Sequence, residues 1–111
     1  IVNTVAEALE LLEEVGAENL GILFDTFHAN IEEPSIEGSI RTAGDRLLHV
    51  HVADSNRWYP GAGHVDFARI VGTLREVGYD GHLSAEILPL PDPHTCAQRT
   101  MEFLERLVRR P

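Results

Sequence analysis

The alternation of apolar and polar positions along the chain predicts helices and strands that follow one another in turn. In four segments apolar residues recur at the spacing of one helix face, and three shorter segments alternate in polarity as half-buried strands do. The predicted helices cover residues 4–15, 35–44, 67–77 and 93–108, and Thr4, Asp66 and Asp92 are expected to cap the first, third and fourth of them. The predicted strands cover residues 20–25, 47–53 and 82–87, and a loop is expected over residues 27–34.

This order of elements is typical of a run of parallel βα units. An open flavodoxin-like sheet has about five strands, and a (β/α)8 barrel needs about 250 residues, so three strands complete neither architecture. The long loops after the strands and the polar strand faces favour the barrel. We therefore expect residues 1–111 to form a single α/β domain, a partial TIM barrel of about three parallel strands and four helices that lacks its N-terminal part.

Each predicted strand carries a metal-binding residue type at or near its C-terminal end. Asp25 ends the first strand, His51 lies late in the second, and Glu86 lies late in the third. Because strand side chains alternate between two faces, His49 shares the face of His51, whereas Leu48 is expected on the opposite, apolar face. Parallel α/β folds bind ligands outside the carboxyl ends of their strands. The pattern therefore predicts that the three ligand-type residues converge on one site.

Two carboxylates and one imidazole form a ligand set that suits a divalent metal. Mn²⁺, Mg²⁺, Co²⁺ and Zn²⁺ all accept such donors, and the oxygen-rich set favours Mn²⁺. Each ligand has a plainer alternative: Asp25 as a cap on the following segment, His51 as a hydrogen-bonded core histidine, and Glu86 as the buried partner of an arginine. On the same side, His28 and Arg57 are candidates to hold the oxygens of a sugar or polyol. Their alternative is a role as solvent-exposed loop residues.

Composition narrows the classes of partner. The formal net charge of −9 argues against the binding of nucleic-acid phosphates. A single cysteine, Cys96, excludes an internal disulfide framework, and no apolar run reaches the length of a membrane span. These observations predict a cytoplasmic protein whose partner is a small molecule, with no nucleic-acid and no membrane partner.

The chain resembles the C-terminal part of the xylose isomerase-like sugar phosphate isomerases and epimerases, and among them the ketose 3-epimerases. The resemblance rests on three motifs, DTFHANIEE, HVHVADSNRWYPGAGHVDF and GYDGHLSAEI, and covers the chain from about Asn3 to Leu107. It implies the C-terminal portion of a TIM barrel that holds one divalent metal, usually Mn²⁺. The matching metal ligands are Asp25, His51 and Glu86.

The resemblance also implies roles for individual side chains. His28 and Arg57 match the residues of the family that contact the substrate. Glu86 matches one of two glutamates that exchange a proton with the carbon beside a carbonyl, through an enediolate. Glu86 is therefore expected to be both a ligand and the catalytic residue. The other glutamate, which is also a metal ligand, would precede the first residue of this chain.

The expected function is a metal-dependent isomerase or epimerase that acts on a ketose or similar sugar. A related metal-dependent lyase, of the inosose dehydratase kind, begins with the same proton removal and stays open. An AP-endonuclease-like nuclease, which the negative charge disfavours, and a catalytically inactive fragment also stay open. The family often has Gly-Glu where this chain has Ala53 and Asp54, and this departure leaves the identity of the sugar open.

Three parallel strands alone would leave a sheet with two unpaired edges and one bare face. Parallel sheets are normally covered on both faces, and unpaired edges are templates for other strands. We therefore expect the 111 residues by themselves to be inactive. They should associate, either as a homo-oligomer or with the missing N-terminal part.

Overall fold

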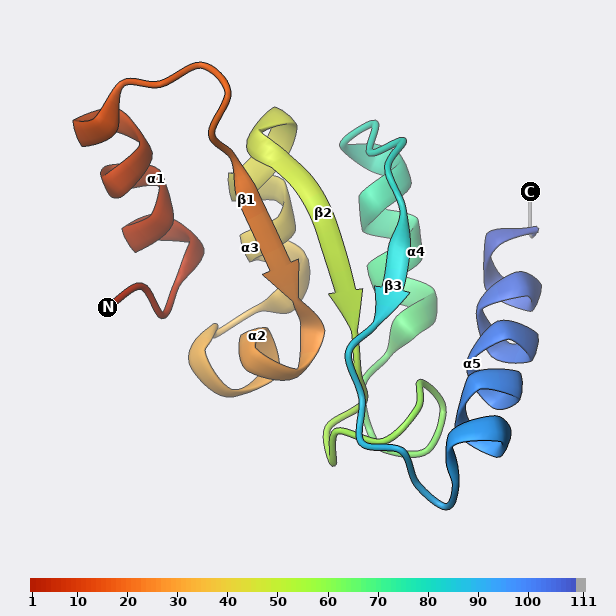
Figure 1. Cartoon of the computed structure of the whole chain (residues 1–111). Helices are drawn as coiled ribbons and strands as arrows, with labels where there is room; N and C mark the ends of the chain where they lie inside the picture. Colours follow the sequence, from red (N-terminus) through yellow and green to blue (C-terminus); the bar gives the residue numbers. More distant parts are fainter. Residues whose placement is uncertain (110–111) are drawn as a thin grey trace.

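The computed structural model describes residues 1–109, and its elements follow the predicted alternation (Figure 1). In chain order they are α1 (Val5–Val15), β1 (Ile22–Asp25), α2 (Thr26–Glu32), α3 (Ile36–Ala43), the 3-10 helix η1 (Gly44–Arg46), β2 (Leu47–Val52), α4 (Phe67–Glu76), β3 (Leu83–Ala85) and α5 (Pro93–Val108). Each predicted helix and strand is present. The first and third strands are shorter than predicted, because β1 begins at Ile22 and β3 ends at Ala85.

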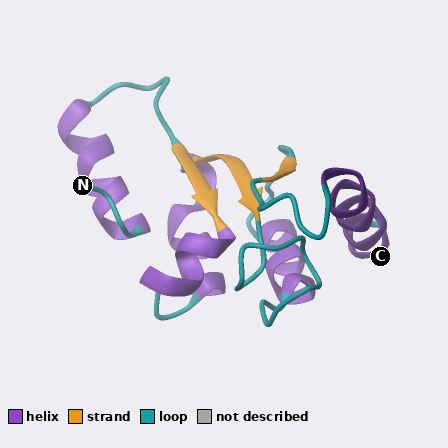
Figure 2. Cartoon of the chain, turned by 60° about the horizontal axis from the view of Figure 1, so that its bottom comes forward, coloured by secondary structure: helices purple, strands orange, loops and turns teal. Residues whose placement is uncertain are grey.

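The three strands form one parallel sheet in the order β1-β2-β3. α3 and α4 lie behind one face of this sheet, while α1 lies on the side of β1 and α5 on the side of β3 (Figure 1). Figure 2 shows the strands above these helices, with no helix of residues 1–109 across the opposite face. The predicted arrangement of parallel βα units is confirmed.

The hydrophobic core lies between the sheet and the two helices behind it. Phe24, Val50 and Val52 contribute from the strands, and Ile40 and Ile70 contribute from α3 and α4; each is at most 3% exposed. Burial of one such side chain stabilises the fold by about 1.5–3 kcal/mol. Because these residues alternate with the polar ones along the strands, packing of the core directs the polar side chains to the uncovered face.

Each α-helix among residues 1–109 begins after a residue whose side chain accepts a hydrogen bond from a backbone N–H of the first turn. These N-caps are Thr4, Asp25, Ser35, Asp66 and Asp92. The caps predicted at Thr4, Asp66 and Asp92 are confirmed. Hydrogen bonds from the Thr95 backbone N–H and hydroxyl also lower the pKa of the Asp92 carboxyl.

The prediction of a loop after the first strand is wrong for most of that segment, because Thr26–Glu32 forms α2. The Asp25 carboxylate starts this helix by accepting a hydrogen bond from the His28 backbone N–H at 3.1 Å. A helix of two turns has no repeated apolar stripe, so periodicity does not reveal it. The described residues therefore form five α-helices instead of the four predicted.

The second strand contains a β-bulge that the alternation of polarity did not predict. Ile22 lies opposite Leu47 and Leu23 lies opposite His49, so the pairing with β1 skips Leu48. Leu47 is buried, whereas Leu48 is 61% exposed. The prediction that Leu48 faces the core is therefore wrong, since the extra residue changes which side chains point inward.

The uncovered face of the sheet carries apolar as well as polar side chains. Leu23 and Leu48 are both more than half exposed, and His49 and His51 are half-buried. This mixture differs from the polar face that an antiparallel sheet turns toward water.

We expect a protein made of these 111 residues alone to self-associate in solution, because the bare face and the edges of β1 and β3 leave apolar surface and backbone groups unpaired. Sedimentation velocity should show species heavier than one chain. Replacement of Leu23 and Leu48 by threonine should reduce the association. The matched change at Met101, which is 58% exposed on α5, should not. A single-chain species with one sharp unfolding transition would contradict this expectation.

Candidate active site

The predicted site residues lie where the strands end. Asp25 is the last residue of β1, and the parallel register sets it opposite His51 of β2, which in turn lies opposite Ser84 of β3. The three residues therefore form one row across the sheet. Neighbouring parallel strands are about 4.8 Å apart, so side chains in adjacent strands of this row can reach one another or a shared ligand.

Asp25 and His51 are brought together. Asp25 Oδ2 lies 3.8 Å from His51 Nδ1, and the two side chains are 10% and 25% exposed, respectively. The other oxygen, Oδ1, accepts the hydrogen bond from the His28 N–H that begins α2. The cap alternative for Asp25 is thus correct for one oxygen, and the second oxygen is left to face His51. Capping fixes the carboxylate at the orientation that presents this second oxygen.

Thr26 fastens the end of β1 to the end of β2. Its hydroxyl donates to the Ala53 carbonyl oxygen at 2.7 Å and accepts from the Ala53 N–H at 2.9 Å. The side chain is completely buried. The Thr26 hydroxyl therefore continues the hydrogen bonding between the two strands by one residue, just beyond Asp25 and His51. Sequence reasoning missed this residue, whose only signal was a small polar side chain directly after the first strand.

His49 lies one pleat below His51 on the same face, as the alternation predicted. The two rings meet edge to face, with centroids 5.2 Å apart and planes at 90°. His49 Nε2 is also hydrogen-bonded to the Ser84 hydroxyl. His49 therefore links the strand that carries His51 to β3 and limits the positions that the His51 ring can take.

Glu86 lies just past the end of β3. Its backbone N–H donates to the Val52 carbonyl oxygen at 3.2 Å, so the pairing of β2 and β3 continues to this residue. Its side chain is exposed, and no ion pair joins it to an arginine among residues 1–109. Within the same residues, no three His, Cys, Asp or Glu side chains lie close enough to hold a metal together. The structure thus brings Asp25 and His51 together but does not bring Glu86 to them.

His28 and Arg57 both contact the Phe27 ring. The Arg57 guanidinium carbon stands 5.0 Å from the centre of the Phe27 ring, and the His28 ring meets the same phenyl ring edge to face at 5.2 Å. A cation over an aromatic face is attracted by the ring. Phe27 was not singled out from the sequence, although its place beside His28 is the signal that identifies it. It brings the two predicted substrate residues into one group.

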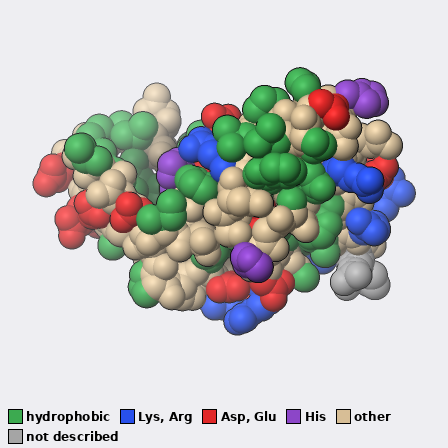
Figure 3. Space-filling model, turned by 90° about the horizontal axis from the view of Figure 1, so that it is seen from below, with side chains coloured by type: hydrophobic (Ala, Val, Ile, Leu, Met, Phe, Trp, Pro, Cys, Tyr) green, Lys and Arg blue, Asp and Glu red, His purple; other side chains and the backbone are tan. Residues whose placement is uncertain are grey.

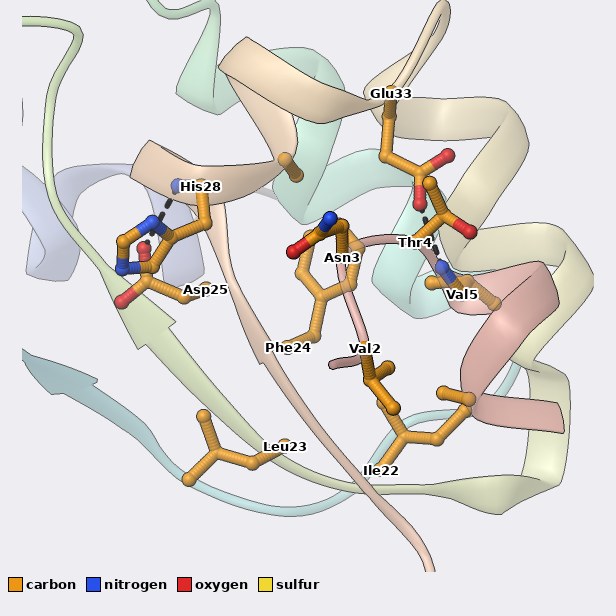
Figure 4. Close-up of a pocket in the computed structure, with 12 residues that line it drawn as sticks. Val2, Asn3, Thr4, Val5, Ile22, Leu23, Phe24, Asp25, His28 and Glu33 are labelled. Carbon is orange, nitrogen blue, oxygen red and sulfur yellow. Dashed lines mark hydrogen bonds between the residues drawn. The ribbon is translucent and has the colours of Figure 1, made fainter. Parts of the chain in front are cut away.

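A pocket with a volume of about 250 Å³ lies beside this group, between the segment before α1, β1 and α2 (Figure 4). Asp25 and His28 line one end of it, and Ile22 lies in its apolar wall. Toward the other end, the Glu33 carboxylate accepts a hydrogen bond of 2.7 Å from the Val5 N–H. The pocket shares Asp25 and His28 with the predicted site, whereas His51, Arg57 and Glu86 are not part of its lining.

The surface at the C-terminal ends of the strands is mixed in character. Seen from this end, hydrophobic side chains cover part of the surface, and the basic side chains lie in separate groups, several of them beside acidic side chains (Figure 3). The face shown therefore offers no continuous basic surface for nucleic-acid phosphates, in keeping with the net charge of −9. No helix within residues 1–109 has both the length and the hydropathy that a membrane crossing requires.

Comparison with known proteins identifies the family. The model of the xylose isomerase-like TIM barrel family matches residues 1–107, so the chain belongs to this family. The predicted fold class, part of a TIM barrel, is thereby confirmed.

The individual relatives include ketose 3-epimerases, the branch of the family that the sequence motifs predicted. The D-psicose 3-epimerase of Enterocloster bolteae is 44% identical over 81 residues, which are 73% of this chain and 27% of that protein. The L-ribulose 3-epimerase of a Methylomonas species is 43% identical over 86 residues, which are 78% of this chain and 30% of that protein. The D-allulose 3-epimerase of a Methylomonas species, solved with D-allulose, superposes with a TM-score of 0.88 at 34% identity and covers 96% of this chain and 43% of its own. The chain thus spans less than half the length of these relatives.

Replacement of Thr26 by valine should lower the free energy of unfolding of the full-length protein by about 1–3 kcal/mol. Valine keeps the shape of threonine but leaves the buried N–H and C=O of Ala53 without their partner. Urea unfolding measures this loss. Thr26→Ser, which keeps the hydroxyl, is the matched control and should lose clearly less. A loss in Thr26→Ser at least as large as the loss in Thr26→Val would contradict this expectation, because the hydroxyl would then not be the main contribution of Thr26.

Proposed function

We propose that the full-length protein is a metal-dependent ketose 3-epimerase. The observation that carries this proposal is the pair formed by Asp25 Oδ2 and His51 Nδ1 at the strand ends. It occurs in a chain whose relatives include D-psicose and L-ribulose 3-epimerases. The substrate class is a free ketose, bound on the open face of the sheet.

The Asp25–His51 pair fits a divalent cation. Bonds from a Zn²⁺-sized ion to carboxylate oxygen and imidazole nitrogen are about 2.0–2.2 Å long. Two atoms 3.8 Å apart can therefore both contact one ion. One carboxylate oxygen and one imidazole nitrogen suit Mn²⁺, Co²⁺ or Zn²⁺, and Mn²⁺ is favoured if further carboxylates join them. Such an ion, when bound, would supply positive charge to the substrate oxygens during proton transfer.

Glu86 is the proposed general acid/base. Glu86 follows Ser84 by two residues. The alternation of side chains along a strand therefore favours the same face of the sheet as Asp25, His51 and Ser84, just beyond the C-terminal end of β3. In this proposal Glu86 removes the proton from the carbon beside the ketose carbonyl, which gives an enediolate. Return of a proton to the opposite face of that carbon completes the epimerisation. That second transfer falls to the other glutamate that the family resemblance implies.

His28 and Arg57 are the proposed substrate-binding residues. Both contact the Phe27 ring, two residues after Asp25, so both lie near the strand end that carries the proposed cation. The Arg57 guanidinium offers several N–H donors in a planar arrangement, which suits the hydroxyl and carbonyl oxygens of a sugar. The proposed partners of the full-length protein are this small-molecule sugar and further copies of the same chain.

The proposed activity is tested with a panel of free ketoses, including D-psicose and L-ribulose, in D₂O. A 3-epimerase should interconvert sugars that differ only at C3 and should place deuterium at that carbon. Chelation should abolish turnover, and Mn²⁺ should restore it. Loss of water from the sugar would instead identify a lyase.

Glu86→Gln in the full-length protein should lower kcat by about 10²–10⁴-fold and leave the unfolding transition unchanged, because an amide keeps the shape but cannot carry the proton. Glu10→Gln, at an exposed position on α1, is the matched control and should be indistinguishable from the unaltered enzyme. Near-normal turnover by the Glu86 variant would exclude it as the acid/base.

Asp25→Asn and His51→Ala should each weaken the binding of Mn²⁺ or Co²⁺ by at least about tenfold, since even residues outside the ligand set change metal affinity by that amount. Calorimetric titration of the metal-free protein measures this change without any sugar. His94→Ala, at an exposed position of α5, is the control for loss of an imidazole. Unchanged affinity in both site variants would place the metal elsewhere.

A further inference from the structure

Asp54 is a buried carboxylate that the proposed reaction does not use. Its side chain is completely buried in the segment that follows β2. Oδ1 accepts hydrogen bonds from the N–H groups of Ser55 at 2.8 Å and Val65 at 3.0 Å, and Oδ2 accepts one from Gly61 at 2.8 Å. No ion pair among residues 1–109 includes this carboxylate. Three backbone donors therefore compensate its burial, and both oxygens are used.

The segment of residues 54–65, called the Asp54 loop below, closes directly on this carboxylate. A Cβ atom on Gly63 would lie 2.4 Å from Asp54 Oδ1 and 2.5 Å from Ser55 Oγ. Any other residue at this position would therefore displace the carboxylate. Ser55 Oγ also accepts a hydrogen bond from the His64 N–H at 2.9 Å, which adds to the closure. The glycine at position 63 is thus matched to the carboxylate at position 54.

Arg57 lies in a turn of the Asp54 loop. Its φ of 63° lies in the left-handed region, which residues with side chains rarely occupy unless their surroundings fix them. Two hydrogen bonds supply that constraint: Arg57 N–H donates to the Asp54 carbonyl oxygen at 2.9 Å, and Asp54 N–H donates to the Trp58 carbonyl oxygen at 3.0 Å. The Arg57 carbonyl oxygen accepts from Leu88 N–H at 2.9 Å, so the same turn is tied to the segment after Glu86.

We infer that Asp54 is a positioning residue for Arg57. The Asp54 carboxylate accepts hydrogen bonds from backbone N–H groups of the loop and thereby keeps the loop closed. The closed loop holds Arg57 in its left-handed turn, and this turn positions the guanidinium over the Phe27 ring beside His28. Asp54 itself is buried and contacts no substrate. The importance of this placement for sugar binding rests on the proposed function, whereas the placement itself does not.

A carboxylate, rather than an amide, is what this loop requires. A side-chain amide offers only one acceptor oxygen, while the loop presents N–H donors to both oxygens of Asp54. In Asp54→Asn, the amide NH₂ would oppose either the Gly61 N–H or the pair from Ser55 and Val65. The size of the side chain is unchanged, so the core packing stays as it is and the defect is confined to the loop.

The test uses the full-length protein with Asp54→Asn and, independently, Gly63→Ala, which retains the carboxylate but displaces it. Gly72→Ala on α4 is the matched control, because a Cβ there meets nothing within 4 Å. Amide exchange at residues 55, 61 and 65 should accelerate by about tenfold or more in both loop variants, the effect of losing a charge-assisted hydrogen bond. The Arg57 side-chain NH signal should lose its fixed position in NMR spectra, and exchange in the core strands should stay unchanged.

Kinetics with a ketose substrate supply the second readout. Both loop variants should raise KM by about tenfold with little change in kcat, as expected for loss of an interaction made equally in the ground and transition states. In an Arg57→Ala background, Asp54→Asn should cause no further rise in KM, because the residue that it positions is gone. Gly72→Ala should match the unaltered enzyme.

The inference is overturned if the loop amides and the Arg57 signal are unchanged in both loop variants. It is equally overturned if the KM effects of Asp54→Asn and Arg57→Ala multiply in the double variant, as they do for independent sites. An unaltered protein that turns over no ketose refutes the proposed function instead, and the exchange and NMR readouts then decide the role of Asp54 alone.

Discussion

The rest of the site depends on the parallel register of β1 and β2. This register sets Asp25 opposite His51, and the two hydrogen bonds of the buried Thr26 hydroxyl continue the pairing just past these residues. Side chains reverse faces at every step along a strand. A slip of one residue would therefore turn one partner toward the core and leave the other alone on the open face.

Polar groups near the strand ends each satisfy two requirements. Asp25 gives one oxygen to the first turn of α2 and keeps the other for His51, so helix formation and site geometry share a single side chain. His49 pairs with Ser84 on one strand and packs against the His51 ring on its own. Because such groups are half-buried and already hydrogen-bonded, little side-chain freedom remains to be lost when a ligand binds.

Much of this arrangement could be predicted from the sequence, because helix spacing and strand alternation report directly on burial. Thr4, Asp66 and Asp92 indicated helix starts, and Asp25 and His51 indicated a shared site. The features that could not be predicted are a helix too short to show periodicity and contacts between distant segments. The short helix after Asp25 has no apolar stripe, and the bonds from Thr26 to Ala53 span 27 positions. The burial of Asp54 likewise depends on amides up to 11 positions away.

The bulge at Leu48 divides β2 into two parts, and the alternation of inward and outward side chains before the bulge does not continue after it. Before it, Leu47 pairs with the first residue of β1; after it, His49 and His51 pair with Leu23 and Asp25. Gly21 accommodates the displaced side chain, since a Cβ there would lie 2.4 Å from Leu48 Cγ. The placement of the His51 imidazole beside Asp25 is therefore set by the pairing that follows the bulge, and not by the alternation that begins at Leu47.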